Sequence, residues 1–117
     1  MATKDDFLPL EKQFWTGNAD WYRKNLDDSC LVAFTEMSGL YGKEDIAATI
    51  KDEARWRNLD LSVKGFLEPA PGVAILTYEA HATRANGEDY AALVSSGYVK
   101  RNGSWKMAFH QPTPLEA

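Results

Sequence analysis

With 117 residues, the chain is long enough for one domain with a modest core and too short for two. Hydrophobic residues make up 44% and charged residues 26%, which is ordinary for a globular protein. The net charge is −4 and no run of lysine or arginine occurs, so the basic surface typical of a nucleic-acid-binding protein is not expected. The single cysteine, Cys30, cannot form an internal disulfide, and no segment resembles a signal peptide or a membrane span. We therefore expect one cytoplasmic domain covering residues 1–117, with no membrane and no nucleic-acid partner.

The first half of the chain is predicted to be mainly helical. Phe7, Leu10 and Phe14 recur at spacings of three and four, which is typical of one face of a helix. Asn18 is a good N-cap for a short second helix. A β-type run is expected over residues 29–37, then a loop around Tyr41, and then a third helix over residues 43–54.

The second half is predicted to consist of strands. Apolar and polar residues alternate in four segments: 59–67, 73–84, 89–100 and 104–111. Asn86-Gly87 and Asn102-Gly103 separate the last three, and Asn-Gly between strand-like runs is the strongest short-range hairpin signal. Helices followed by antiparallel strands predict an α+β domain.

The two Asn-Gly steps allow a prediction of which residues share a face of the sheet. Two-residue turns pair Lys100 with Trp105 and Thr83 with Tyr90, and paired residues lie on the same face. The face expected to meet the helices then carries Thr77, Glu79, His81, Val94, Ser96, Tyr98, Trp105, Met107, Phe109 and Gln111. The opposite face carries Leu76, Tyr78, Ala80, Ala82, Ala91, Leu93, Ser95, Gly97, Val99, Ala108 and His110. A bulge or a one-residue slip would exchange these sets.

The opposite face is small, apolar and almost uncharged, although a sheet with helices on one side should be polar on the other. Something is therefore expected to cover it, and a second copy of the chain is the simplest cover. We predict a homodimer through this outer sheet face.

Four segments together resemble the nuclear transport factor 2-like superfamily, and most closely its SnoaL-like and ketosteroid isomerase-like small proteins, including a branch of unknown function. They are residues 11–28 ("EKQFWTGNADWYRKNLDD"), the loop at Gly42, residues 72–80 ("GVAILTYEA") and residues 97–114 ("GYVKRNGSWKMAFHQPTP"). The resemblance implies a cone-shaped fold, in which N-terminal helices pack on a strongly bent, mainly antiparallel sheet and leave a cavity. It also implies that the outer sheet face commonly dimerises.

The resemblance fixes no activity, because fold is a poor guide to function. Neither the Tyr/Asp arrangement of the isomerases nor the Asp/Arg set of the epoxide hydrolases can be matched residue by residue. The catalytic candidates are Glu79 and His81, which lie two apart on a strand and point to the same side. A carboxylate in an apolar cavity has a raised pKa and can act as a general acid or base, with His81 as partner. The alternative is that Glu79 is hydrogen-bonded to a helix residue or lies at the solvent-exposed cavity mouth, and that His81 lies near the rim.

A small apolar or amphipathic ligand is the expected partner of the cavity. Its candidate contacts are Trp15, Tyr41, Trp56, Thr77, Ser96, Tyr98, Phe109 and Gln111. The alternative for each of these is a purely structural place in the core. Glu79 and His81 lack a third ligand, so no metal is expected, and no motif indicates a cofactor.

Two hypotheses of function follow. In one, the protein binds a small molecule and acts as a cofactor-independent isomerase, cyclase or lyase that uses a cavity carboxylate. In the other, it is a non-catalytic ligand-binding or protein-association dimer module.

Overall fold

The computed structural model describes residues 3–33, 38–50 and 55–115. Three helices and six strands follow one another in these residues: α1 (Lys4–Thr16), α2 (Ala19–Asn25), β1 (Leu26–Ala33), β2 (Ser38–Gly42), α3 (Lys43–Ala47), β3 (Trp56–Ala70), β4 (Val73–Arg84), β5 (Asp89–Arg101) and β6 (Ser104–Pro114). None of the helices in this part of the chain is long and apolar enough to cross a membrane.

Helix α1 forms because its ends and its apolar spacing both favour a helix. At the start, the Asp6 carboxylate accepts a hydrogen bond from the Thr3 backbone N–H at 2.8 Å. The helix buries Phe7, Glu11, Phe14 and Trp15, which recur at helical spacing and form one stripe. Three of these four side chains are aromatic, so the stripe is a large apolar surface that the sheet must cover.

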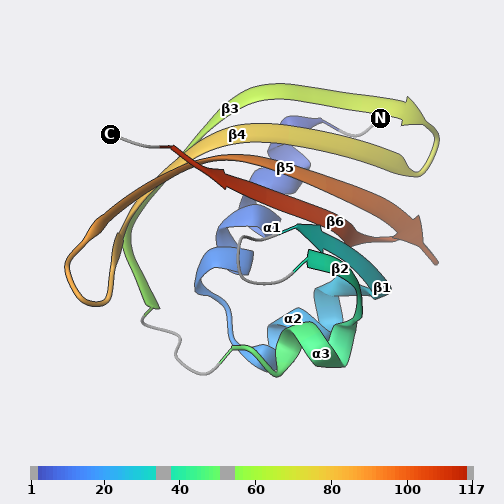
Figure 1. Ribbon diagram of the computed structural model, residues 1–117. Coiled ribbons are helices and arrows are strands. Elements are labelled where there is room, and N and C mark those ends of the chain that lie inside the picture. The colour runs from blue at the N-terminus through green and yellow to red at the C-terminus, as the bar shows by residue number, and fades with distance from the viewer. Residues whose placement is uncertain (1–2, 34–37, 51–54, 116–117) are drawn as a thin grey trace.

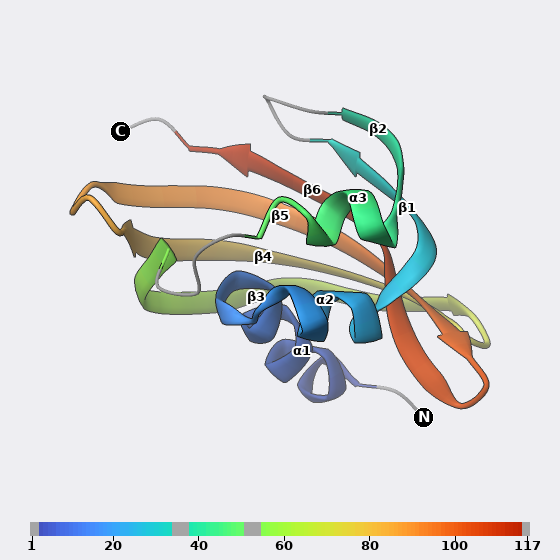
Figure 2. The ribbon, with the colours of Figure 1, turned by 90° about the horizontal axis from the view of Figure 1, so that it is seen from below.

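The strands form one sheet in the order β2-β1-β6-β5-β4-β3. Neighbouring strands are antiparallel except β1 and β6, which are parallel. In Figure 1 the long strands β3 to β6 arch over α1, and Figure 2 shows α1, α2 and α3 on the same side of the bent sheet. The predicted α+β cone, with N-terminal helices on a curved and mainly antiparallel sheet, is confirmed.

Three of the predicted elements have different bounds. The segment around Tyr41 is not a loop but the edge strand β2, which pairs Tyr41 with Cys30. The helix predicted over residues 43–54 ends at Ala47, and its residues 51–54 lie outside the described part. The strand predicted over 29–37 begins earlier, at Leu26, and residues 34–37 also lie outside that part.

The β5–β6 hairpin follows the predicted register only near its turn. Asn102 and Gly103 have φ values of 51° and 83°, as a tight hairpin turn requires, and Lys100 pairs with Trp105 as predicted. A bulge then shifts the pairing, so that Ser96 lies opposite His110. His110 therefore lies on the inner face, and the predicted inner positions of Phe109 and Gln111 are wrong.

The β4–β5 connection is wider than the predicted two-residue turn. The Arg84 N–H donates to the Glu88 carbonyl at 2.7 Å, and Thr83 pairs with Asp89 rather than with Tyr90. This one-residue slip reverses β4, because side chains alternate along a strand. Tyr78 is consequently buried on the inner side with Leu76 and Ala80. The predicted inner positions of Thr77, Glu79 and His81 are wrong, because all three lie on the outer face.

The outer face carries a row of apolar residues, one from each strand. Pairing across the sheet aligns them in the sequence Leu67, Ile75, Gly97, Phe109, Leu31 and Leu40, which we call the outer row. Four of them are large and well exposed, with exposed fractions of 42% at Ile75 to 74% at Leu40. Glu79 and His81 lie on the same face, further along β4, so the outer face is not the uncharged surface that the predicted register implies.

Candidate functional site

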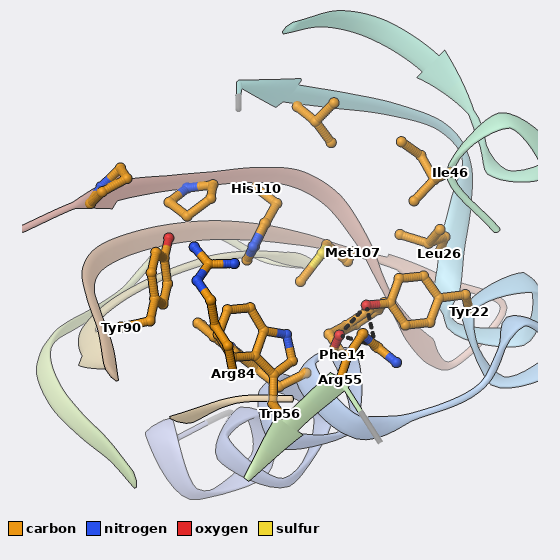
Figure 3. Close-up of a pocket in the computed structure, with 14 residues that line it drawn as sticks. Phe14, Tyr22, Leu26, Ile46, Arg55, Trp56, Arg84, Tyr90, Met107 and His110 are labelled. Carbon is orange, nitrogen blue, oxygen red and sulfur yellow. Dashed lines mark hydrogen bonds between the residues drawn. The ribbon is translucent and has the colours of Figure 1, made fainter. Parts of the chain in front are cut away.

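A pocket of about 260 Å³ lies between the helices and the inner face of the sheet. Figure 3 shows the residues that line it: Phe14, Trp15, Tyr22, Leu26, Val32, Ile46, Arg55, Trp56, Arg84, Tyr90, Met107, His110, Pro112 and Pro114. Most of these side chains are apolar or aromatic, and the polar groups are few, which is the usual composition of a small-molecule site. The pocket includes two of the predicted contacts, Trp15 and Trp56.

One wall of the pocket is a cluster of three aromatic rings that converge from α1, β3 and β5. The ring centroids of Trp15 and Trp56 are 5.0 Å apart, those of Trp56 and Tyr90 are 5.0 Å apart, and Trp15 lies 6.1 Å from Tyr90. The guanidinium of Arg84 lies 5.1 Å from the Trp56 ring and 4.7 Å from the Tyr90 ring. This wall therefore combines flat apolar surfaces with a cation held against them.

Arg55 holds together the floor of the pocket. Its guanidinium donates to the backbone carbonyls of Gly17 at 3.1 Å and Phe14 at 3.2 Å, and to the Tyr22 hydroxyl at 3.2 Å. The Tyr22 hydroxyl in turn donates to the Phe14 carbonyl. Arg55 thus satisfies carbonyl groups at the end of α1 and fixes α2 against it.

His110 is the polar group that β6 contributes to the pocket wall. Its Nδ1 lies 2.9 Å from the Ser96 hydroxyl on β5, which the bulge in β6 brings opposite. Burial disfavours the charged imidazolium and lowers the pKa of His110 to about 4. His110 is therefore neutral at physiological pH.

Behind this wall lies Glu11, a fully buried carboxyl group from α1. It accepts hydrogen bonds from Tyr78 at 2.6 Å, from Ser96 at 3.0 Å and from the Tyr98 hydroxyl. Burial raises the pKa of Glu11 above its ordinary value of 4.5, and the three hydroxyl donors only partly oppose that shift.

Two pocket residues connect to Glu11 through these hydroxyls. Trp15 donates from its indole N–H to the Tyr78 oxygen at 2.9 Å, and His110 contacts Ser96. While Glu11 is ionised, Ser96 donates its hydroxyl proton to Glu11, and Nδ1 of His110 then carries the ring proton. The network therefore couples the tautomer of His110 to the charge of Glu11 and orients the Trp15 ring.

The remaining predicted contacts do not line the pocket. Ser96 and Tyr98 are buried behind its wall as partners of Glu11. Tyr41 packs against the core from β2, away from the pocket-lining set. The structure places the other three, Thr77, Phe109 and Gln111, on the outer face.

Glu79 and His81 contact each other on the outer face, with His81 Nε2 and a Glu79 carboxylate oxygen 3.0 Å apart. The hydrogen bond from His81 lowers the pKa of Glu79 below 4.5. The expected raised pKa of a desolvated Glu79 is therefore wrong. Within the part of the chain that the structure describes, no cluster of three or more His, Cys, Asp or Glu side chains could hold a metal ion.

Sequence reasoning missed Glu11, Arg55, Arg84, Tyr90 and His110. Glu11 had a readable signal, because it follows Phe7 by four residues and precedes Phe14 by three, so it lies on the apolar stripe of a helix. A lone acid in that position is buried and needs partners. Arg55 and Arg84 had no such signal. Arg55 precedes β3 and Arg84 ends β4, so the direction of each side chain depends on the register of its strand.

The helices and the bent sheet, with the pocket between them, define a cone-shaped α+β domain, and comparison with solved structures identifies the fold as nuclear transport factor 2-like. An NTF-2-like protein of unknown function from Shewanella oneidensis is 15% identical, with a TM-score of 0.71 over 94% of this chain and 98% of that one. An NTF2-like protein of unknown function in nutrient uptake from Rhodospirillum rubrum is 15% identical, with a TM-score of 0.72 over 92% and 93%. The association domain of C. elegans CaMKII is 16% identical, with a TM-score of 0.68 over 94% of each chain.

No protein-family model and no curated protein matches the sequence. The likeness to solved structures therefore establishes the fold and leaves the activity to be argued from the pocket.

Proposed function

We propose that the protein binds a small apolar or amphipathic molecule in the pocket between α1, α2 and the inner sheet face. The observation that carries this proposal is the aromatic wall of Trp15, Trp56 and Tyr90, which borders a cavity of about 260 Å³ instead of filling it. Flat rings beside an unfilled space offer a ligand large contact area at little entropic cost.

Two neighbouring residues on β1 provide a matched test. Val32 is buried and lines the pocket, whereas Leu31 is 48% exposed on the outer face. Val32→Phe should reduce binding of the neutral dye N-phenyl-1-naphthylamine, because the added ring occupies the pocket, and Leu31→Phe should not. Fluorescence titration, with circular dichroism to verify folding, measures both. Equal dye binding by the two folded variants would contradict the proposal.

A second candidate is a cofactor-independent isomerase, cyclase or lyase in which His110 transfers a proton. The specific observation in its favour is the Ser96 bridge, which links a pocket histidine to a buried carboxyl group. In this candidate Glu11, and not Glu79 or His81, is the carboxyl group that supports the chemistry. Deuterium uptake at the α-carbon of a small ketone, followed by NMR, should then be faster with the wild type than with His110→Gln. Equal uptake would leave binding as the better account.

We further propose that the outer row forms the interface of a homodimer. Leu40, Leu67, Leu31 and Ile75 are exposed apolar side chains on one face, and exposed apolar patches of this kind mark interaction sites. A symmetric dimer lets one such face cover the other. One of the similar solved structures is an association domain by name, which supports an assembly role for this fold.

A further inference from the structure

We infer that the natural ligand is an organic anion, a carboxylate or sulfonate on a flat apolar body, whose charged group binds Arg84 at the pocket mouth while its body packs on the aromatic wall. This inference rests on the proposed binding function and specifies its ligand class.

The described residues that line the pocket include basic side chains but no acidic ones. The described lining residues include two arginines, Arg55 and Arg84, and no Asp or Glu. His110 adds no negative charge, and the nearest buried acid, Glu11, lies behind the wall within a shell of hydroxyl donors. The chain as a whole carries a net charge of −4, so the pocket is a locally positive site on a negative protein. Such a site concentrates anions and repels cations.

In the described part of the chain, the guanidinium of Arg84 contacts aromatic rings and no acidic side chain. Within the residues that the structure describes, no carboxylate lies within ion-pair distance of this guanidinium. Arg23, by contrast, pairs with two carboxylates and Arg101 with one. The Trp56 and Tyr90 rings hold the guanidinium in place by cation–π contact. Ring contacts use the flat faces of the guanidinium group. Its N–H edge can therefore bind a planar anion through two parallel hydrogen bonds. Figure 3 shows Arg84 beside Tyr90 and directed toward His110 across the pocket.

The aromatic wall supplies the site for the apolar body and argues against a cationic ligand. Rings that bind quaternary ammonium groups offer their faces to the ligand. Here Arg84 already lies against two of the three rings, so a second cation would meet like charge at that point. A flat anion instead places opposite charge at Arg84 and packs its rings against Trp15 and Trp56.

An isosteric pair of competitors tests the inference. 2-Naphthoate and 2-naphthamide share one shape and differ in charge, and each can displace N-phenyl-1-naphthylamine from the wild-type protein. We expect 2-naphthoate to bind about tenfold more tightly, since hydrogen bonds to charged groups contribute more than neutral ones. In Arg84→Gln the preference should fall to within about twofold, because the charged donor is lost. The preference of the wild type should also weaken with added salt.

Arg57→Gln is the matched control. Arg57 is exposed on β3 next to Trp56, pairs with Thr83 and is not among the pocket-lining residues. The Arg57→Gln substitution removes the same charge from the same region but leaves the pocket lining unchanged. The preference for 2-naphthoate should therefore persist in this variant. Equal binding of both competitors, or a preference unchanged by Arg84→Gln, would overturn the anion inference while leaving the binding pocket intact. Failure of the neutral dye to bind the wild type would overturn the proposed function and this inference together.

Discussion

Replacing Glu11 with Gln should make the protein more stable relative to the wild type as the pH rises. Glu11 is fully buried, and burial raises its pKa above 4.5. Between the unfolded-state pKa of about 4.5 and the higher folded-state value, the folded wild type retains a proton that the unfolded chain releases. The wild type therefore loses stability across this window, and a neutral amide at position 11 does not.

The size of the effect follows from linkage. One proton held by the folded state and released by the unfolded state changes the free energy of unfolding by at most about 1.4 kcal/mol per pH unit. The difference between the Glu11→Gln variant and the wild type should be flat below pH 4.5, rise with about that slope, and level off above the folded-state pKa. The Gln oxygen can still accept from Tyr78 and Ser96, but its amide group cannot accept from Tyr98, which adds a pH-independent offset of about 1 kcal/mol.

Urea denaturation of both proteins between pH 4.5 and 8.5 measures this difference, and all other titrating groups cancel in it. Glu11→Leu is the informative control, because it leaves three buried hydroxyls without their acceptor. Each such loss costs about 1–3 kcal/mol, so this variant should be destabilised by roughly 3 kcal/mol or more at every pH. A difference between Glu11→Gln and the wild type that is independent of pH, or that falls as pH rises, would refute the reasoning.

Three further predictions concern the outer face and His110. Ile75→Glu places a carboxylate in the outer row and should convert the dimer to a monomer, as measured by light scattering. Gln13→Glu, on the exposed side of α1, should leave the dimer intact. A wild type that is monomeric at micromolar concentration would exclude the interface. The His110 ring should titrate near pH 4 by NMR, so its contribution to stability is lost as pH falls from about 6.5 toward 4, and a midpoint near 6.5 would show that the ring is solvated. Glu79 should titrate below 4.5 and return toward that value in His81→Gln, and an unchanged midpoint would assign the shift to another group.

The sequence was a good guide to the fold, because the strongest signals act locally. The Asn102-Gly103 turn has the two positive φ values that this dipeptide favours, and the pairing of Lys100 with Trp105 follows from it. Helix periodicity likewise predicted that Phe7 and Phe14 are buried, although Leu10 is only half-buried. The bend of the sheet and the side on which the helices lie follow from the resemblance of the whole pattern rather than from any one motif.

The chemistry of the site was much less predictable, because it depends on register. In β4, Ala74, Leu76, Tyr78, Ala80 and Ala82 alternate with a set that contains Thr77, Glu79 and His81. That alternation alone indicates which set is buried. The prediction relied instead on an assumed two-residue turn at Asn86-Gly87, and the wider turn reversed every side chain of the strand. Where the expected turn type and the apolar pattern of a strand disagree, the pattern is the better guide to the register. Inverting the strand would expose each buried apolar side chain and bury a polar one in its place, and each exchange costs folding free energy.

Two irregularities of the sheet therefore decide which polar groups reach its inner face. The wide turn after Arg84 brings Tyr78 to the inner face, and the bulge in β6 brings His110 there opposite Ser96. Without the wide turn Glu11 would lose the Tyr78 hydroxyl as a donor, and without the bulge Ser96 would no longer link it to His110. A buried carboxyl group with missing partners is costly, so Glu11 itself favours the register in which Tyr78, Tyr98 and Ser96 converge on it. Glu11, one of the residues that sequence reasoning missed, thus connects the register of the sheet to the polar groups of the pocket wall.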